Sequence, residues 1–79
     1  MARYRLLFKR SVAKDLHAIP RNAVHRILKR IRDLPDDPRP HGCEKLTDQE
    51  RYRLLQGQYR VVYEVEDAVL VVTVVGVTQ

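Results

Sequence analysis

A predicted β-hairpin over residues 51–65 constrains the fold of this chain more than any other segment. The sequence RYRLLQGQYRVVYEV holds two runs of strand-forming residues separated by a short break at 56–58, where Gly57 can adopt the positive φ of a tight turn. Side chains alternate across a strand, so Arg51 and Arg53 share one face, and Arg60 of the second run can join them. The pattern therefore predicts a cluster of three guanidinium groups on a stiff backbone.

This predicted arginine cluster (Arg51, Arg53 and Arg60) requires an anion, because neighbouring cations repel one another. Guanidinium groups bind phosphates and carboxylates bidentately, so the cluster indicates either a polyanion or a carboxylate-rich partner. Arginine is poorly suited to proton transfer, since its pKa lies above about 12. Glu64 falls on the face of Arg60 and is expected to pair with it.

Other residues with chemically useful side chains have simpler interpretations. The pleat puts Tyr59 and Tyr63 on the face opposite Arg60, which favours core packing. His17 and His25 fall on helix surfaces, where exposure to solvent is the simpler expectation. His41 lies in the loop that leads to the hairpin, and it is the one histidine considered for acid–base chemistry, although a loop position without chemistry is favoured.

The length and cysteine content limit the class of protein. A chain of 79 residues forms one domain over residues 1–79. Cys43 is the sole cysteine, which excludes an intramolecular disulfide and fits a reducing cytoplasm. One cysteine and three scattered histidines lack the spacing of zinc ligands, and neither a metal nor a cofactor is expected. The longest nearly uncharged stretch, 68–79, is too short to span a bilayer, so no membrane association is expected.

The remaining segments predict strands and helices around the hairpin. Residues 2–9 alternate in polarity and predict a strand that buries Tyr4, Leu6 and Phe8. Ser11 is the expected N-cap of a short helix, which Pro20 ends. Residues 21–34 carry an apolar stripe at helical spacing. Residues 35–40, PDDPRP, predict a rigid loop, and the β-branched run 69–77 predicts a central strand.

Positive charge is concentrated in the N-terminal part of the chain. Residues 1–32 contain ten Lys or Arg against Asp15 alone, so their net charge is +9, whereas the whole chain carries +5. A solvated helix face is the simpler interpretation of this basicity. The alternative is binding of an anionic partner, which is favoured by the lack of acidic residues at i+4 that could pair with these charges.

The predicted order is strand, helix, helix and three strands. We therefore expect an α+β fold, in which an N-terminal strand and a helical hairpin precede a three-stranded antiparallel meander, all forming one antiparallel sheet covered on one face by the helices. The sequence leaves open whether the first strand is an edge or inserts beside the last strand.

In this order and in several motifs, the chain resembles the RelE/ParE superfamily of toxins from type II toxin–antitoxin modules. The resemblance rests on YRLLFKRSVAKDLHAIP, on the basic second helix, on HGCEKL, and above all on GQYRVVYEVED. It implies a cytoplasmic protein that is inhibited by a cognate antitoxin. RelE-like members cleave mRNA on the ribosome, whereas ParE-like members inhibit DNA gyrase.

Carried over residue by residue, the resemblance implies that Arg51, Arg53 and Arg60 are the catalytic residues that contact the mRNA. Arginine at the first two positions departs from members that carry lysine there. The family also continues past its last strand with a basic segment and a tyrosine, for which VGVTQ offers no counterpart. The alternatives to a RelE-like endoribonuclease are a gyrase inhibitor and an inactive homologue that only binds its antitoxin. Homodimerisation is an alternative way to cover apolar surface.

Overall fold

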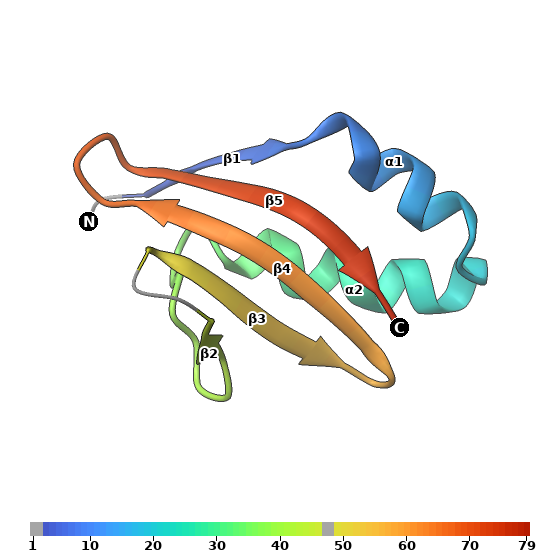
Figure 1. The fold of residues 1–79 in the computed structure, drawn as a ribbon. Coiled ribbons are helices and arrows are strands. Elements are labelled where there is room, and N and C mark those ends of the chain that lie inside the picture. Colours follow the sequence, from blue (N-terminus) through green and yellow to red (C-terminus); the bar gives the residue numbers. More distant parts are fainter. Residues whose placement is uncertain (1–2, 47–48) are drawn as a thin grey trace.

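The computed structural model describes residues 3–46 and 49–79 and has the predicted α+β order. Its elements are β1 (Arg5–Phe8), α1 (Arg10–His17), α2 (Arg21–Asp33), β2 (Glu44–Lys45), β3 (Arg51–Gln56), β4 (Tyr59–Glu66) and β5 (Val71–Thr78). The strands form one sheet in the spatial order β1-β5-β4-β3-β2 (Figure 1). The two-residue strand β2 lies in HGCEKL and was not among the predicted strands.

The predicted meander is confirmed, because β3, β4 and β5 pair in antiparallel fashion. The turn between β3 and β4 consists of two residues, Gly57 and Gln58, and Gly57 has a φ of 60°. Glycine at the first central position with positive φ is typical of a type II′ turn, whose twist matches that of the flanking strands. The turn therefore fixes the register that brings Arg60 opposite Leu55.

The first strand is an edge strand that lies beside the last one, which answers the question left open by the sequence. β1 pairs with β5 in parallel, so the expectation of a wholly antiparallel sheet is wrong. Parallel neighbours need a long crossover connection, and α1 and α2 supply the helical part of the path from β1 back toward the sheet. Of the predicted strand 2–9, residue 2 lies outside the described residues.

Both helices pack on one face of the sheet, and the other face carries no helix in the described part of the chain (Figure 1). We call the second face the open face. The core between helices and sheet is built from α1, from the apolar stripe of α2 and from inward residues of β3, β4 and β5. Its central members are Val12, Ile27, Ile31, Leu34, Leu54, Val61, Tyr63, Val65, Val72 and Val74.

Two local expectations for the N-terminal region are wrong. Phe8 is 47% exposed, because it ends the edge strand β1, where little of the core reaches it. Ser11 is not the N-cap of α1; Lys9 holds that position, and the Ser11 hydroxyl instead donates to the Val75 carbonyl at 3.4 Å. Pro20 acts as expected, since α1 ends before it and it is the N-cap of α2.

The last strand departs from simple alternation. Its register shifts between Val62 and Tyr63 of β4, so that Val74 and Val77 are both buried although they are three residues apart. Inside this irregularity, the backbone N–H of Val77 donates to Asp15 of α1 at 3.0 Å. The strand begins at Val71, two residues later than predicted, because a turn precedes it.

Candidate functional site

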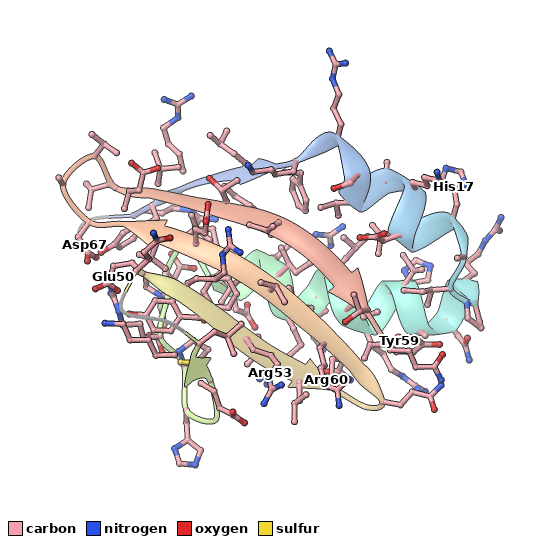
Figure 2. The ribbon with its side chains drawn as sticks, in the orientation of Figure 1. His17, Glu50, Arg53, Tyr59, Arg60 and Asp67 are labelled. Carbon is pink, nitrogen blue, oxygen red and sulfur yellow. The ribbon has the colours of Figure 1, made fainter. Side chains whose placement is uncertain are left out.

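The three predicted site arginines lie on the open face of the sheet. Arg51 and Arg53 are separated by one residue on β3 and alternate with the buried side chains of Tyr52 and Leu54. Arg60 of β4 lies opposite Leu55, and Arg53 lies opposite Val62, so Arg53 and Arg60 are diagonal neighbours across the two strands (Figure 2). The strand register therefore puts the three arginines on one face of the sheet, as the sequence predicted.

Arg51 is already bound to a carboxylate. Its Nε and Nη2 both donate to Oε2 of Glu64, at 3.1 and 2.6 Å. The two residues are directly opposite each other in the β3–β4 register, and both side chains are about one-third exposed, at 39% and 32%. The expectation that Glu64 pairs with Arg60 is wrong, because the register brings Arg51 and not Arg60 in line with it.

Arg53 makes a second such pair, which sequence reasoning missed. Its Nη2 donates to Oε2 of Glu44 at 2.7 Å, and Glu44 lies opposite it on β2. The Nε of Arg53 is buried and has no hydrogen-bond partner in the described part of the chain. A buried donor without a partner costs about 1–3 kcal/mol relative to a satisfied one. Glu44 lies shortly before the predicted hairpin, and that proximity in sequence is the signal that could have pointed to it.

Arg60 has no side-chain carboxylate partner among the described residues. Its Nη1 donates to the main-chain oxygen of Gln79 at 3.0 Å, and the residue is exposed. The three cluster arginines thus differ: two are held by side-chain carboxylates and one by a main-chain oxygen.

A separate polar network fixes the start of the hairpin. Arg39, from the loop between α2 and β2, donates to Asp67 at 2.7 and 3.2 Å, to Glu50 at 3.0 Å and to the hydroxyl of Tyr52 at 2.8 Å. Its guanidinium also stacks over the Tyr52 ring, 5.2 Å from the centroid. Tyr4 donates to Asp67 at 2.5 Å, so the network joins four segments of the chain. Figure 2 shows Glu50 and Asp67 together at the end of the sheet distant from Arg60.

This network lowers the pKa of both carboxyl groups. The pKa of Asp67 lies below its ordinary value chiefly because Arg39 donates to it, and Tyr4 adds to the effect. The pKa of Glu50 is lowered first by the Tyr52 hydroxyl and then by Arg39. The carboxylates in turn raise the pKa of Arg39. Both carboxylates and the guanidinium therefore stay charged through the physiological pH range, as expected of ion pairs that stabilise the fold.

The loop at 35–43 is also held from within the core. Tyr63 is fully buried, and its hydroxyl donates to the carbonyl of Pro38 at 2.7 Å. Burial raises the pKa of Tyr63, and the nearby Cys43 adds to this. The predicted core role of Tyr63 is confirmed, and Tyr59 packs half-buried against the core. His41 is exposed in this loop and makes no hydrogen bond to another described residue.

The basic residues of the N-terminal part of the chain, unlike Arg51 and Arg53, are mostly not paired with carboxylates. Nine of the ten basic side chains in residues 3–32 form no ion pair with any described residue, the exception being Arg3 with Asp36. Asp15 forms no ion pair with a described residue, and its carboxylate accepts the Val77 N–H instead. His17 and His25 are exposed on the helices, as expected. Within the described residues, no group of three potential ligands could hold a metal ion, and no helix is long and apolar enough to cross a membrane.

Comparison with known proteins agrees with this architecture. The family model described as "ParE toxin of type II toxin-antitoxin system, parDE" matches residues 6–78. Among curated proteins, no sequence matches significantly. The chain therefore belongs to the ParE toxin family of type II toxin–antitoxin systems, within the RelE/ParE superfamily of toxins.

Several solved toxin structures share the fold. The toxin–antitoxin complex RelBE2 of Mycobacterium tuberculosis matches with a TM-score of 0.84 at 21% identity, covering 98% of each chain. The archaeal RelE–RelB complex of Pyrococcus horikoshii matches with 0.82 at 26% identity, covering 95% of this chain and 92% of that one. A double mutant of the E. coli toxin RelE in the free state matches with 0.79 at 27% identity, covering 100% and 84%.

Proposed function

We propose that this toxin is a RelE-like endoribonuclease that cleaves mRNA on the ribosome and so inhibits translation. The observation that carries the proposal is the gathering of Arg51, Arg53 and Arg60 on the open face of the sheet. Two rigid strands hold these side chains, which suits precise placement of a phosphodiester. Similarity to toxin structures that include RelE supports the same reading.

The chemistry that suits this cluster is stabilisation of a phosphorane-like transition state. When a ribose 2′-OH attacks the adjacent phosphate, negative charge grows on the non-bridging oxygens, and guanidinium groups stabilise that charge most strongly in the transition state. Arginine keeps its proton at neutral pH, so other groups must take the 2′-OH proton and protonate the 5′ oxygen that leaves when the P–O5′ bond breaks.

Cleavage of mRNA on programmed ribosomes tests the proposal. We expect the full chain to cut the mRNA in the A site, and we expect Arg60→Ala to lower the rate at least about 100-fold, the usual loss of one transition-state donor. Arg32→Ala is the matched control, because Arg32 is an exposed arginine on α2 that forms no ion pair with a described residue. Intact mRNA with the unmodified chain would refute the proposal, and so would equal losses in the two variants.

Gyrase inhibition is the second candidate, and one observation favours it. The family model that matches is the one described for ParE toxins. Under this alternative the arginine cluster is a docking surface for a protein. Gyrase-dependent DNA breaks with intact mRNA would establish it, whereas growth without arrest and with retained antitoxin binding would indicate an inactive toxin homologue.

We further propose that a cognate antitoxin binds this chain. Structures with the same fold include complexes of toxins with their antitoxins. Leu7 and Leu55 point to the open face and are 42% and 49% exposed, which leaves apolar surface for a partner to bury. Co-purification with the product of the neighbouring gene, and a monomer by light scattering in its absence, would support an antitoxin over a homodimer.

A further inference from the structure

We propose that the carboxylates of Glu44 and Glu64 act as internal substitutes for phosphate. They occupy two guanidinium groups of the arginine cluster until RNA displaces them. The inference rests on the proposed RNA-binding function and adds a regulatory step to it. In the free protein the two carboxylates occupy Arg51 and Arg53, and only Arg60 is without a carboxylate.

The geometry at Arg51 is that of an occupied anion site. Its Nε and Nη2 form the edge of the guanidinium that binds an oxyanion, and both donate to the same oxygen of Glu64. Glu64 comes from the neighbouring strand and lies directly opposite Arg51. The carboxylate is therefore held beside the arginine by the sheet itself. A phosphate can bind this edge only after Glu64 has moved away.

At Arg53 the internal ion pair leaves one guanidinium donor without a partner. Glu44 receives a hydrogen bond from Nη2 alone, and the buried Nε has no partner among the described residues. The two non-bridging oxygens of a phosphodiester can accept from Nε and Nη2 together. Binding RNA would then satisfy a donor that the internal pair leaves unsatisfied, which favours the exchange at this arginine.

The pairing also changes how the protein attracts nucleic acid at a distance. The three arginines and two glutamates together present a net charge of +1, in place of +3 for the arginines alone. Cations on α1 and α2 form no such pairs with described residues, so the helical layer keeps its positive charge. Free RNA should therefore bind the cluster weakly. A strand held in place with two adjacent phosphates can displace both carboxylates at once.

Binding of a short single-stranded RNA to the full chain tests this inference. Fluorescence anisotropy of a labelled 12-nucleotide RNA is measured between about 50 and 300 mM KCl, a range over which charge effects are large. The test variant is Glu44→Gln/Glu64→Gln. The control is Asp37→Asn/Glu66→Gln, which removes the same charge from two exposed residues, and neither carboxylate forms an ion pair with a described residue. Thermal unfolding checks that both variants fold.

We expect the test variant to bind RNA about tenfold more tightly at low salt, a gain in the range of two ion pairs released. Its plot of log K against log salt should steepen by about 1.4, since each exposed cation adds about 0.7 for single strands. The control variant should gain less than about twofold, with little change in slope.

Three results would overturn the inference. Equal gains in the test and control variants would show a general effect of net charge. No gain in the test variant would show that the carboxylates do not compete with RNA. A larger gain in affinity for a poly-glutamate peptide than for RNA would assign the cluster to an acidic protein.

Ribosomal cleavage separates this inference from the proposed function. If the test and control variants gain equally in RNA affinity while the unmodified chain still cuts mRNA, the masking alone is refuted. Tighter RNA binding by the test variant, together with intact mRNA after incubation with the unmodified chain, refutes the nuclease alone.

Discussion

Replacing Tyr63 with phenylalanine should reveal how much the buried hydroxyl contributes to stability. Tyr63 is 0% exposed, and its hydroxyl donates to the carbonyl of Pro38 at 2.7 Å, so the substitution removes one hydrogen bond and keeps the ring. Pro38 is itself buried, and its carbonyl would be left without that donor. Losing one partner of a buried hydrogen bond costs about 1–3 kcal/mol. We expect about 1.5 kcal/mol for Tyr63→Phe, the lower half of that range.

For a domain of this size, each 1 kcal/mol lowers Tm by about 4–8 °C, so the expected decrease is about 6–12 °C. Urea unfolding followed by circular dichroism measures the free energy, and calorimetry measures Tm. Tyr4→Phe is the control, because it removes a tyrosine hydroxyl that is hydrogen-bonded near the surface, and we expect a loss within about 0.5 kcal/mol. Equal stability of Tyr63→Phe and the unmodified chain would refute the reasoning that this hydroxyl anchors the 35–43 loop.

Two further predictions concern the network at Arg39 and the turn before β5. Asp67 and Glu50 have lowered pKa values in the folded protein, so their contribution to stability is complete above the unfolded pKa values of about 4 and is lost as the pH falls below them. Urea midpoints between pH 3 and pH 7 should therefore drop at the acid end, and Arg39→Gln should flatten this dependence; parallel curves would contradict the assignment. Leu70 has a φ of 55°, which is strained for leucine, so Leu70→Gly should stabilise the protein by about 0.5–1 kcal/mol in urea unfolding. Val69 does not have a positive φ, so Val69→Gly relieves no such strain. An equal gain in stability from Val69→Gly would contradict the explanation.

The hairpin and the helices could be predicted because their signals are local. Alternation over 51–65 determines which face each side chain takes, and this placed Arg51, Arg53 and Arg60 together without knowledge of the rest of the chain. The apolar stripe of α2 likewise predicted a helix that the structure ends at Asp33. Such patterns depend on the geometry of a single element, and tertiary contacts did not override them.

The partners of these elements could not be predicted, because they depend on register. Glu64 is four residues from Arg60 in sequence, but the β3–β4 register aligns it with Arg51. Glu44 reaches Arg53 only because two residues form the short strand β2. The edge exposure of Phe8 has the same origin, since it depends on β1 lying outside β5. Pairing across the sheet therefore decided the electrostatics of the site.

The position of β5 has a consequence for how this toxin becomes active. β5 follows every other described element in the chain, yet it lies inside the sheet, between β1 and β4. β1 has no other strand to pair with, so the first and last strands must meet before the core can close, and contacts between such distant segments form slowly. A nascent chain still missing residues 71–78 would leave the inner edges of β1 and β4 unpaired. The toxin is thus expected to gain its folded form only after those residues have emerged from the ribosome that made it, and an antitoxin present at that moment would meet it newly folded.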